Sequence, residues 1–163
     1  MGQYYSYKPR TNSPLVFVLK GLIPYTQENL MLAFKPGVFF YELSKVSHYK
    51  RKQIEAAYYL AKREKLFEIS KNEIKITEIG RKIIRPYMAQ RLSKRTRLLV
   101  VFDIPEDIAV IRARLRRILR QWHFQQIQKS VWVTDFDHED SIKALILELD
   151  IEPYVQLYEC SRL

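Results

Sequence analysis

The 163-residue sequence contains one cysteine, four glycines and no long apolar run. One cysteine excludes an internal disulfide and a multi-cysteine zinc site, and four glycines leave no Gly-rich phosphate loop. The longest apolar run near the amino end, residues 15–19, is too short to span a bilayer, and no secretory signal pattern is visible. The three histidines, His48, His123 and His138, do not have metal-ligand spacing. We therefore expect a cytoplasmic protein with no membrane span and no resident cofactor.

Aspartate is also missing from the first 93 residues, which hold 17 Lys/Arg against 7 Glu. Residues 94–163 hold 11 Lys/Arg against 11 Asp/Glu, so the whole net charge of +10 lies in the first part. A strongly basic segment beside a neutral one indicates that the basic segment has a polyanionic partner, most often nucleic acid.

The first part predicts a flexible basic arm followed by a small helical domain. Residues 1–13 have no apolar periodicity, and we expect the DNA-binding domain to span residues 14–88. Apolar segments at 14–22 and 26–34 precede a short helix at 38–46. A second helix at 48–66, for which Ser47 is a candidate cap, has a buried face formed by Ile54, Ala57, Tyr58 and Ala61. Two short alternating runs, 66–70 and 73–77, flank Lys71 and Asn72 as a hairpin does, and Thr77 caps a last helix.

This order, helix-turn-helix, hairpin and helix, resembles a winged helix-turn-helix, most clearly at "ITEIGRKII". The resemblance implies duplex-DNA binding, with the second helix in the major groove. The predicted DNA-binding residues on and beside that helix are cations and ring-bearing residues: His48, Tyr49, Arg51, Lys52, Tyr59, Lys62 and Arg63. Lys71 and Lys75 of the hairpin are further candidates for phosphate contact. For each of these residues, a solvated surface position is the alternative.

Residues 89–95 form a predicted linker, and residues 96–163 predict a second domain with the order β-α-β-β-α-β. This is the order of a ferredoxin-like fold, so we expect an α+β protein of two domains. Three segments, "LVVFDIPED", "RARLRRILRQWHF" and "QIQKSVWV", closely resemble the central domain of PaaX-like regulators, which is similar to the small CRISPR-adaptation nuclease. The resemblance implies a homodimeric transcriptional regulator. Repressors of this family are longer and have a further carboxy-terminal region, so no acyl-CoA effector is carried over and the effector is unknown.

The role of Asp103 distinguishes a nuclease from a DNA-binding protein. In the CRISPR nuclease, the carboxylate at the end of the first strand is the proposed ligand of Mg²⁺, and Asp103 matches that position. The alternative is architectural: Asp103 ends a strand and caps a helix in which Pro105 takes the first position and acids follow. One Asp per chain is a poor Mg²⁺ site unless a dimer brings two together. We therefore expect a DNA-binding repressor, with a Mg²⁺-dependent nuclease or a CRISPR-adaptation component as the alternative. We expect Arg112, Arg116 and Arg120 to pair locally with acids, and a phosphate-binding stripe is the alternative for this row.

Overall fold

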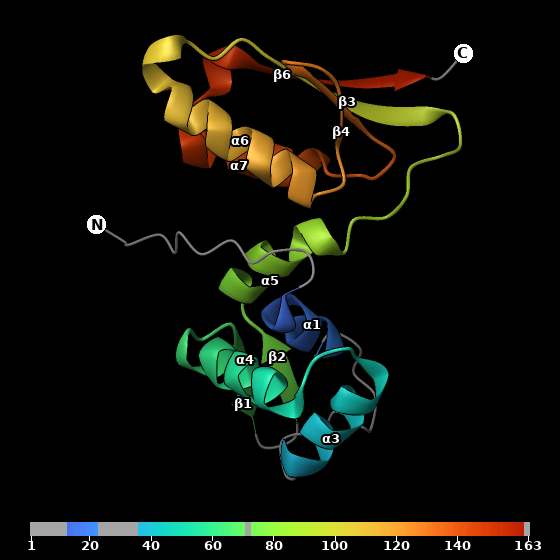
Figure 1. Ribbon diagram of the computed structural model, residues 1–163, viewed down its shortest axis with the longest axis vertical. Coiled ribbons are helices and arrows are strands. Elements are labelled where there is room, and N and C mark those ends of the chain that lie inside the picture. Colours follow the sequence, from blue (N-terminus) through green and yellow to red (C-terminus); the bar gives the residue numbers. More distant parts are fainter. Residues whose placement is uncertain (1–12, 23–35, 71–72, 162–163) are drawn as a thin grey trace. The chain divides into compact units, whose positions relative to one another are not determined.

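The computed structural model describes residues 13–22, 36–70 and 73–161 (Figure 1). The chain divides into two compact units, Met1–Ile84 and Arg85–Leu163. The division falls four residues before the end of the predicted DNA-binding domain at 88, and the predicted linker 89–95 falls in the second unit. The predicted arm and the apolar segment 26–34 lie outside the described residues, apart from Ser13. No helix in the described ranges is long and apolar enough to cross a membrane.

The first unit contains helices and one two-stranded antiparallel sheet. Its elements are α1 (Pro14–Gly21), α3 (Pro36–Val46), α4 (Arg51–Arg63), β1 (Phe67–Ser70), β2 (Glu73–Ile76) and α5 (Glu78–Ile84). The predicted cap Thr77 is confirmed, because its Oγ1 accepts a hydrogen bond from Gly80 N at 3.2 Å. The same hydroxyl donates to Lys65 O at 2.8 Å and so ties α5 to the end of α4.

The predicted cap Ser47 is wrong. Helix α4 begins at Arg51, and the backbone N–H of Lys50 donates to Gln53 Oε1 at 2.9 Å. Ser47 Oγ instead accepts from Tyr49 N at 3.3 Å, in a bend that precedes the helix. The helix therefore starts three residues later than the predicted range, and two of the predicted contact residues precede it.

The second unit is built on a four-stranded antiparallel sheet with the order β4-β5-β3-β6. Its elements in chain order are η1 (Arg85–Tyr87), β3 (Thr96–Phe102), η2 (Glu106–Ile108), α6 (Ala109–Gln121), β4 (Gln125–Gln128), β5 (Val131–Thr134), α7 (Glu139–Leu149), η3 (Glu152–Tyr154) and β6 (Val155–Ser161). Helices and antiparallel sheets in both units confirm the predicted α+β class.

One face of this sheet carries the core of the second unit. Helices α6 and α7 lie on that face, where Leu98, Val100 and Phe102 of β3 are buried (Figure 1). The alternate residues Leu99 and Val101 point to the opposite face and are only half buried. The sheet therefore has one packed face and one face that no helix covers among the described residues.

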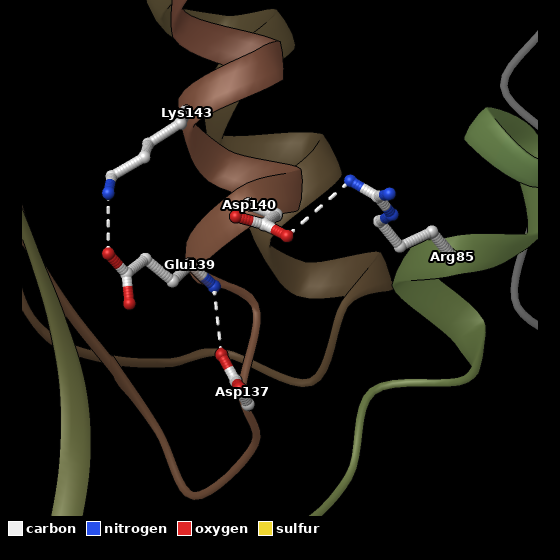
Figure 2. A network of polar contacts seen from close by, with 5 residues as sticks. All are labelled: Arg85, Asp137, Glu139, Asp140 and Lys143. Atoms are coloured by element: carbon white, nitrogen blue, oxygen red, sulfur yellow. Dashed lines mark hydrogen bonds and ion pairs between the residues drawn. The ribbon is translucent and has the colours of Figure 1, made fainter.

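Polar contacts fix the start of α7 (Figure 2). Asp137 Oδ1 accepts from Glu139 N at 3.3 Å, and Glu139 pairs with Lys143 one turn further along the helix. Asp140 pairs with Arg85 of η1, with 3.5 Å between Oδ2 and Nη1. These contacts connect the beginning of the second unit to its last helix.

Candidate nucleic-acid interface

Helix α4 is held by one buried face. Ile54, Ala57, Tyr58 and Ala61 are buried, as predicted from their spacing. The ring of Tyr58 lies 5.2 Å from the ring of Phe40 in α3 and 5.2 Å from that of Phe67 in β1. Because α4 packs through these residues, its opposite side is exposed within the described part of the chain.

The predicted helical contact residues are all exposed: Arg51, Lys52, Tyr59, Lys62 and Arg63. They differ in their partners. Arg51 Nε lies 2.7 Å from Glu55 Oε1, and Arg63 Nε lies 3.1 Å from Glu64 Oε1. Lys52 and Lys62 make no ion pair or hydrogen bond with any described residue. These two ammonium groups are available to an external anion.

His48 and Tyr49 lie in the bend before α4. The Tyr49 ring contacts His48 at 4.4 Å and Phe17 of α1 at 5.8 Å, measured between ring centroids. Partial burial raises the pKa of the Tyr49 hydroxyl. Tyr49 therefore packs inside the first unit as well as bordering the exposed side of α4.

Only one of the two candidate lysines of the hairpin lies within the described residues. Lys75 is exposed in β2 and lies opposite Glu68 of β1 in the ladder. Lys71 lies outside the described residues. The structure therefore locates one of the two hairpin cations, in the same unit as α4.

Asp103 directly follows β3, and its exposed carboxylate contacts no described group. Its backbone N–H donates to Tyr154 O at 2.9 Å, which continues the pairing of β3 with the chain before β6. The predicted capping role is wrong, because Pro105 occupies the cap position and the helical turn begins at Glu106.

The described residues around Asp103 do not form a magnesium site within one chain. The described residues include no group of three His, Cys, Asp or Glu side chains that could hold a metal ion. The nearby Glu106 carboxylate is already 2.6 Å from Arg112 Nη2. The side chains of a single chain therefore do not fit the Mg²⁺ site that the nuclease resemblance implies.

The predicted local pairing of the α6 arginines with acids is correct only for Arg112. Arg116 Nη2 donates to the backbone carbonyl of Lys129 at 3.0 Å, and its guanidinium lies 5.7 Å from the centre of the Phe102 ring. Arg120 lies over the indole of Trp132 at 5.4 Å. The prediction fails for Arg116 and Arg120 because α6 contains no acidic residue, and these two side chains lie against a backbone carbonyl and aromatic rings of the sheet.

Two features of the second unit escaped the sequence analysis. His138 is 1 % exposed among the rings of Trp122, Phe124 and Phe136. A pocket of about 350 Å³ lies nearby, and Asp135 at its wall pairs with Arg91 and Arg97. Neither has a local sequence signal, because the residues of each come from several separate elements.

One comparison with known proteins gave a match, and it lies within the second unit. A comparison with curated proteins gave no significant match, and a comparison with solved structures gave none either. Residues 95–163 match the family described as the PaaX protein central Cas2-like domain, which confirms the resemblance drawn from the three sequence segments. Residues 95–163 are therefore similar to the central Cas2-like domain of PaaX proteins.

Proposed function

We propose that this protein is a DNA-binding transcriptional regulator of the PaaX-like type, acting as a repressor that occupies an operator. The exposed side of α4 carries the proposal, because Lys52 and Lys62 are unpaired cations in the part of the chain that holds all of the net positive charge. A cationic helix face with hydrogen-bonding side chains suits a major groove about 12 Å wide.

The arrangement of the first unit supports a winged helix-turn-helix. Helices α3 and α4 follow one another across a short bend, the β1–β2 hairpin comes next, and α5 closes the unit. In such a domain α4 is the recognition helix and the hairpin is the wing. Lys52 and Arg63 would then contact base edges or phosphates, with Arg51 and Lys62 beside them as phosphate contacts.

The second unit supports a ferredoxin-like arrangement that forms a homodimer. Its first strand β3 lies in the interior of the sheet between β5 and β6, with β4 and β6 at the edges. The uncovered face presents Leu99 and Val101 together with Tyr158 of β6, which is 48 % exposed. A second copy packed on this face would bury apolar side chains and give the regulator a two-fold axis.

Selection of bound duplexes from a random DNA pool, with Mg²⁺ present and an aliquot examined for cleavage, tests the function. Enrichment of an intact inverted repeat is the expected result. Failure to enrich any sequence would contradict operator binding. Degradation that stops with a chelator and with Asp103→Ala would instead support the nuclease, for which the free Asp103 carboxylate is the favouring observation.

The α4 assignment has its own test. We expect Lys52→Ala with Arg63→Ala to lower specific affinity by at least about tenfold, because two charge-assisted contacts are lost. Thermal stability should not fall, since both side chains are exposed. Lys20→Ala with Lys82→Ala is the matched control, because both lysines are exposed cations of the first unit outside α4. Equal losses in the two pairs would contradict a recognition role for α4.

The dimer is tested by sedimentation of the full chain. Tyr158→Glu should shift the protein to monomer, because it places a charge on the uncovered face. Val110→Glu is the control, since Val110 is 84 % exposed on α6. A wild-type monomer, or a dimer that survives Tyr158→Glu, would contradict pairing through this face.

A further inference from the structure

Helix α6 concentrates positive charge in a part of the chain, residues 94–163, that is neutral overall. It contains five arginines and no acidic residue, although residues 94–163 hold 11 Lys/Arg against 11 Asp/Glu. The acids of this unit therefore lie elsewhere, and the helix depends on side chains from other elements for neutralisation.

Only the first two arginines of α6 receive that neutralisation. Arg112 pairs with Glu106 at 2.6 Å, and Arg114 pairs with Glu148 of α7 at 3.1 Å. The remaining cations have no acidic partner among the described residues: Arg116, Arg117, Arg120 and, in the β4–β5 turn, Lys129. We call these four residues the α6 basic surface.

The four residues form one continuous surface. Arg116 and Arg120 are four residues apart on α6, and Arg117 and Arg120 are three apart, so each pair occupies neighbouring positions on the helix. Lys129 joins them because its carbonyl accepts the hydrogen bond from Arg116 Nη2. Residues from a helix and from a turn of the sheet thus meet at one place.

Two of the arginines are held in position before any ligand arrives. The ring of Phe102, 2 % exposed, supports Arg116, and the indole of Trp132, 1 % exposed, supports Arg120. A guanidinium fixed by packing loses less side-chain entropy when it binds, and its planar donors match the oxygens of a phosphate. The Nε of Arg116 is buried without a hydrogen-bond acceptor, which costs free energy. Interactions of the Nη groups must offset that cost.

We propose that the α6 basic surface binds phosphates of a nucleic-acid backbone, as a contact separate from α4. This inference rests on the proposed function in that the partner is nucleic acid. A nucleic-acid backbone suits this surface better than an acidic protein does, because the planar donors of three guanidinium groups match phosphate oxygens and none of the four side chains is apolar or aromatic. Specificity would come from α4, and the α6 surface would add sequence-independent affinity.

The test uses the full chain and a fluorescent duplex of random sequence, titrated at several NaCl concentrations. Arg117→Gln with Lys129→Gln removes two exposed charges whose side chains form no hydrogen bond or ion pair with a described residue, so the fold should be preserved. Lys94→Gln with Arg95→Gln is the matched control, with two exposed cations of the same unit outside the surface. Lys52→Gln with Lys62→Gln is measured in parallel.

We expect the slope of log K against log salt to decrease in magnitude by about 2 for Arg117→Gln with Lys129→Gln, because each lost phosphate contact contributes about 0.9. The control should retain the wild-type slope. If the wild type binds DNA and Arg117→Gln with Lys129→Gln has the same slope as the control pair, the inference is overturned while the α4 proposal stands. If the Arg117 and Lys129 pair lowers the slope and the Lys52 and Lys62 pair behaves like the control, the inference stands and the α4 assignment fails. Binding of polyglutamate but not DNA, lost in the Arg117 and Lys129 pair, would overturn the inference in favour of an acidic protein.

Discussion

Helices α4 and α6 have the same length, 13 residues, and the same design of one buried face and many cations, yet they use their cations differently. In α4, Lys52 and Lys62 extend from the protein without a partner. In α6, Arg112, Arg116 and Arg120 lie against a carboxylate, a backbone carbonyl and two aromatic rings. An amphipathic pattern alone therefore does not distinguish a cation offered to a ligand from one that also stabilises the fold.

The difference follows from residue type and from the neighbouring elements. Arginine has a planar guanidinium that stacks on rings and donates to carbonyls while its stem packs, whereas lysine has a compact, strongly hydrated charge. Helix α6 lies over a sheet that presents Phe102 and Trp132 to it. Helix α4 packs through small and aromatic residues and leaves its lysines in solvent.

The first way to sharpen the comparison is to destabilise only the first unit, which holds α4. A Cβ on Gly80 would lie 2.0 Å from the backbone oxygen of Leu66 and 2.8 Å from Ile76 Cγ2. We expect Gly80→Ala to destabilise the first unit by about 3 kcal/mol or more, because the obstructing atom is backbone and α5 must move.

Thermal unfolding followed by circular dichroism and by tryptophan fluorescence measures this effect. Both tryptophans, Trp122 and Trp132, are in the second unit, so fluorescence reports on that unit. Gly37→Ala is the control, since a Cβ there meets only the end of the Arg51 side chain at 3.9 Å. An unchanged circular dichroism transition in Gly80→Ala, or a fluorescence transition that falls equally, would contradict the prediction.

The second prediction concerns the unit that holds α6. His138 stacks on Trp122, the residue that ends α6, with 5.9 Å between ring centroids. Burial lowers the pKa of His138 from 6.5 to about 4; the charge of nearby His123 acts in the same direction, and the Trp122 carbonyl and Asp137 oppose it. The two ring nitrogens are buried without a hydrogen bond of normal geometry.

The sign of the effect follows from proton binding. Because the unfolded chain binds the proton near pH 6.5 and the folded chain only near pH 4, stability is complete above pH 6.5 and falls as the pH drops towards 4. The loss should reach about 3 kcal/mol, since each pKa unit corresponds to about 1.4 kcal/mol. Denaturant unfolding followed by tryptophan fluorescence measures it.

His138→Phe should remove this pH dependence, because a neutral ring fills a site lined by three aromatic rings. His123→Asn should retain it, and asparagine suits the positive φ of 61° at that exposed position. A wild-type stability that is flat between pH 7 and pH 4.5 would refute the assignment of His138 as the responsible group.

Much of the fold was predictable because the patterns are local. The spacing of Ile54, Ala57, Tyr58 and Ala61 predicted the buried face of α4. The strand and helix order of the second unit follows the predicted order. The start of α4 was missed because the aromatic contact of Tyr49 with Phe17, which residue spacing does not encode, holds the preceding bend.

The candidate sites were less predictable because their contacts are long-range. Arg114 pairs with Glu148, 34 residues away, and Arg120 rests on Trp132 of a strand. The absence of any acid within α6 is visible in the sequence, so the local pairing that was expected depends on acids from other elements. What replaces that pairing depends on which elements lie over the helix, and only the structure gives this.

The smallest predicted effect tests the comparison of the two helices most directly. Arg112 and Arg51 both pair with a glutamate, but the Arg112 side chain is 23 % exposed and also donates to Ile104 O at 3.3 Å, whereas Arg51 is 54 % exposed. Arg112→Met should therefore destabilise the second unit by about 1 kcal/mol, and Arg51→Met should change the first by less than about 0.5 kcal/mol. Both variants keep an aliphatic stem, so each measures the loss of polar contacts and not of packing. Denaturant unfolding, followed by fluorescence for Arg112→Met and by circular dichroism for Arg51→Met, gives the two values. If they are equal, the cations of α6 are no more structural than those of α4, and the distinction between the two helices is lost.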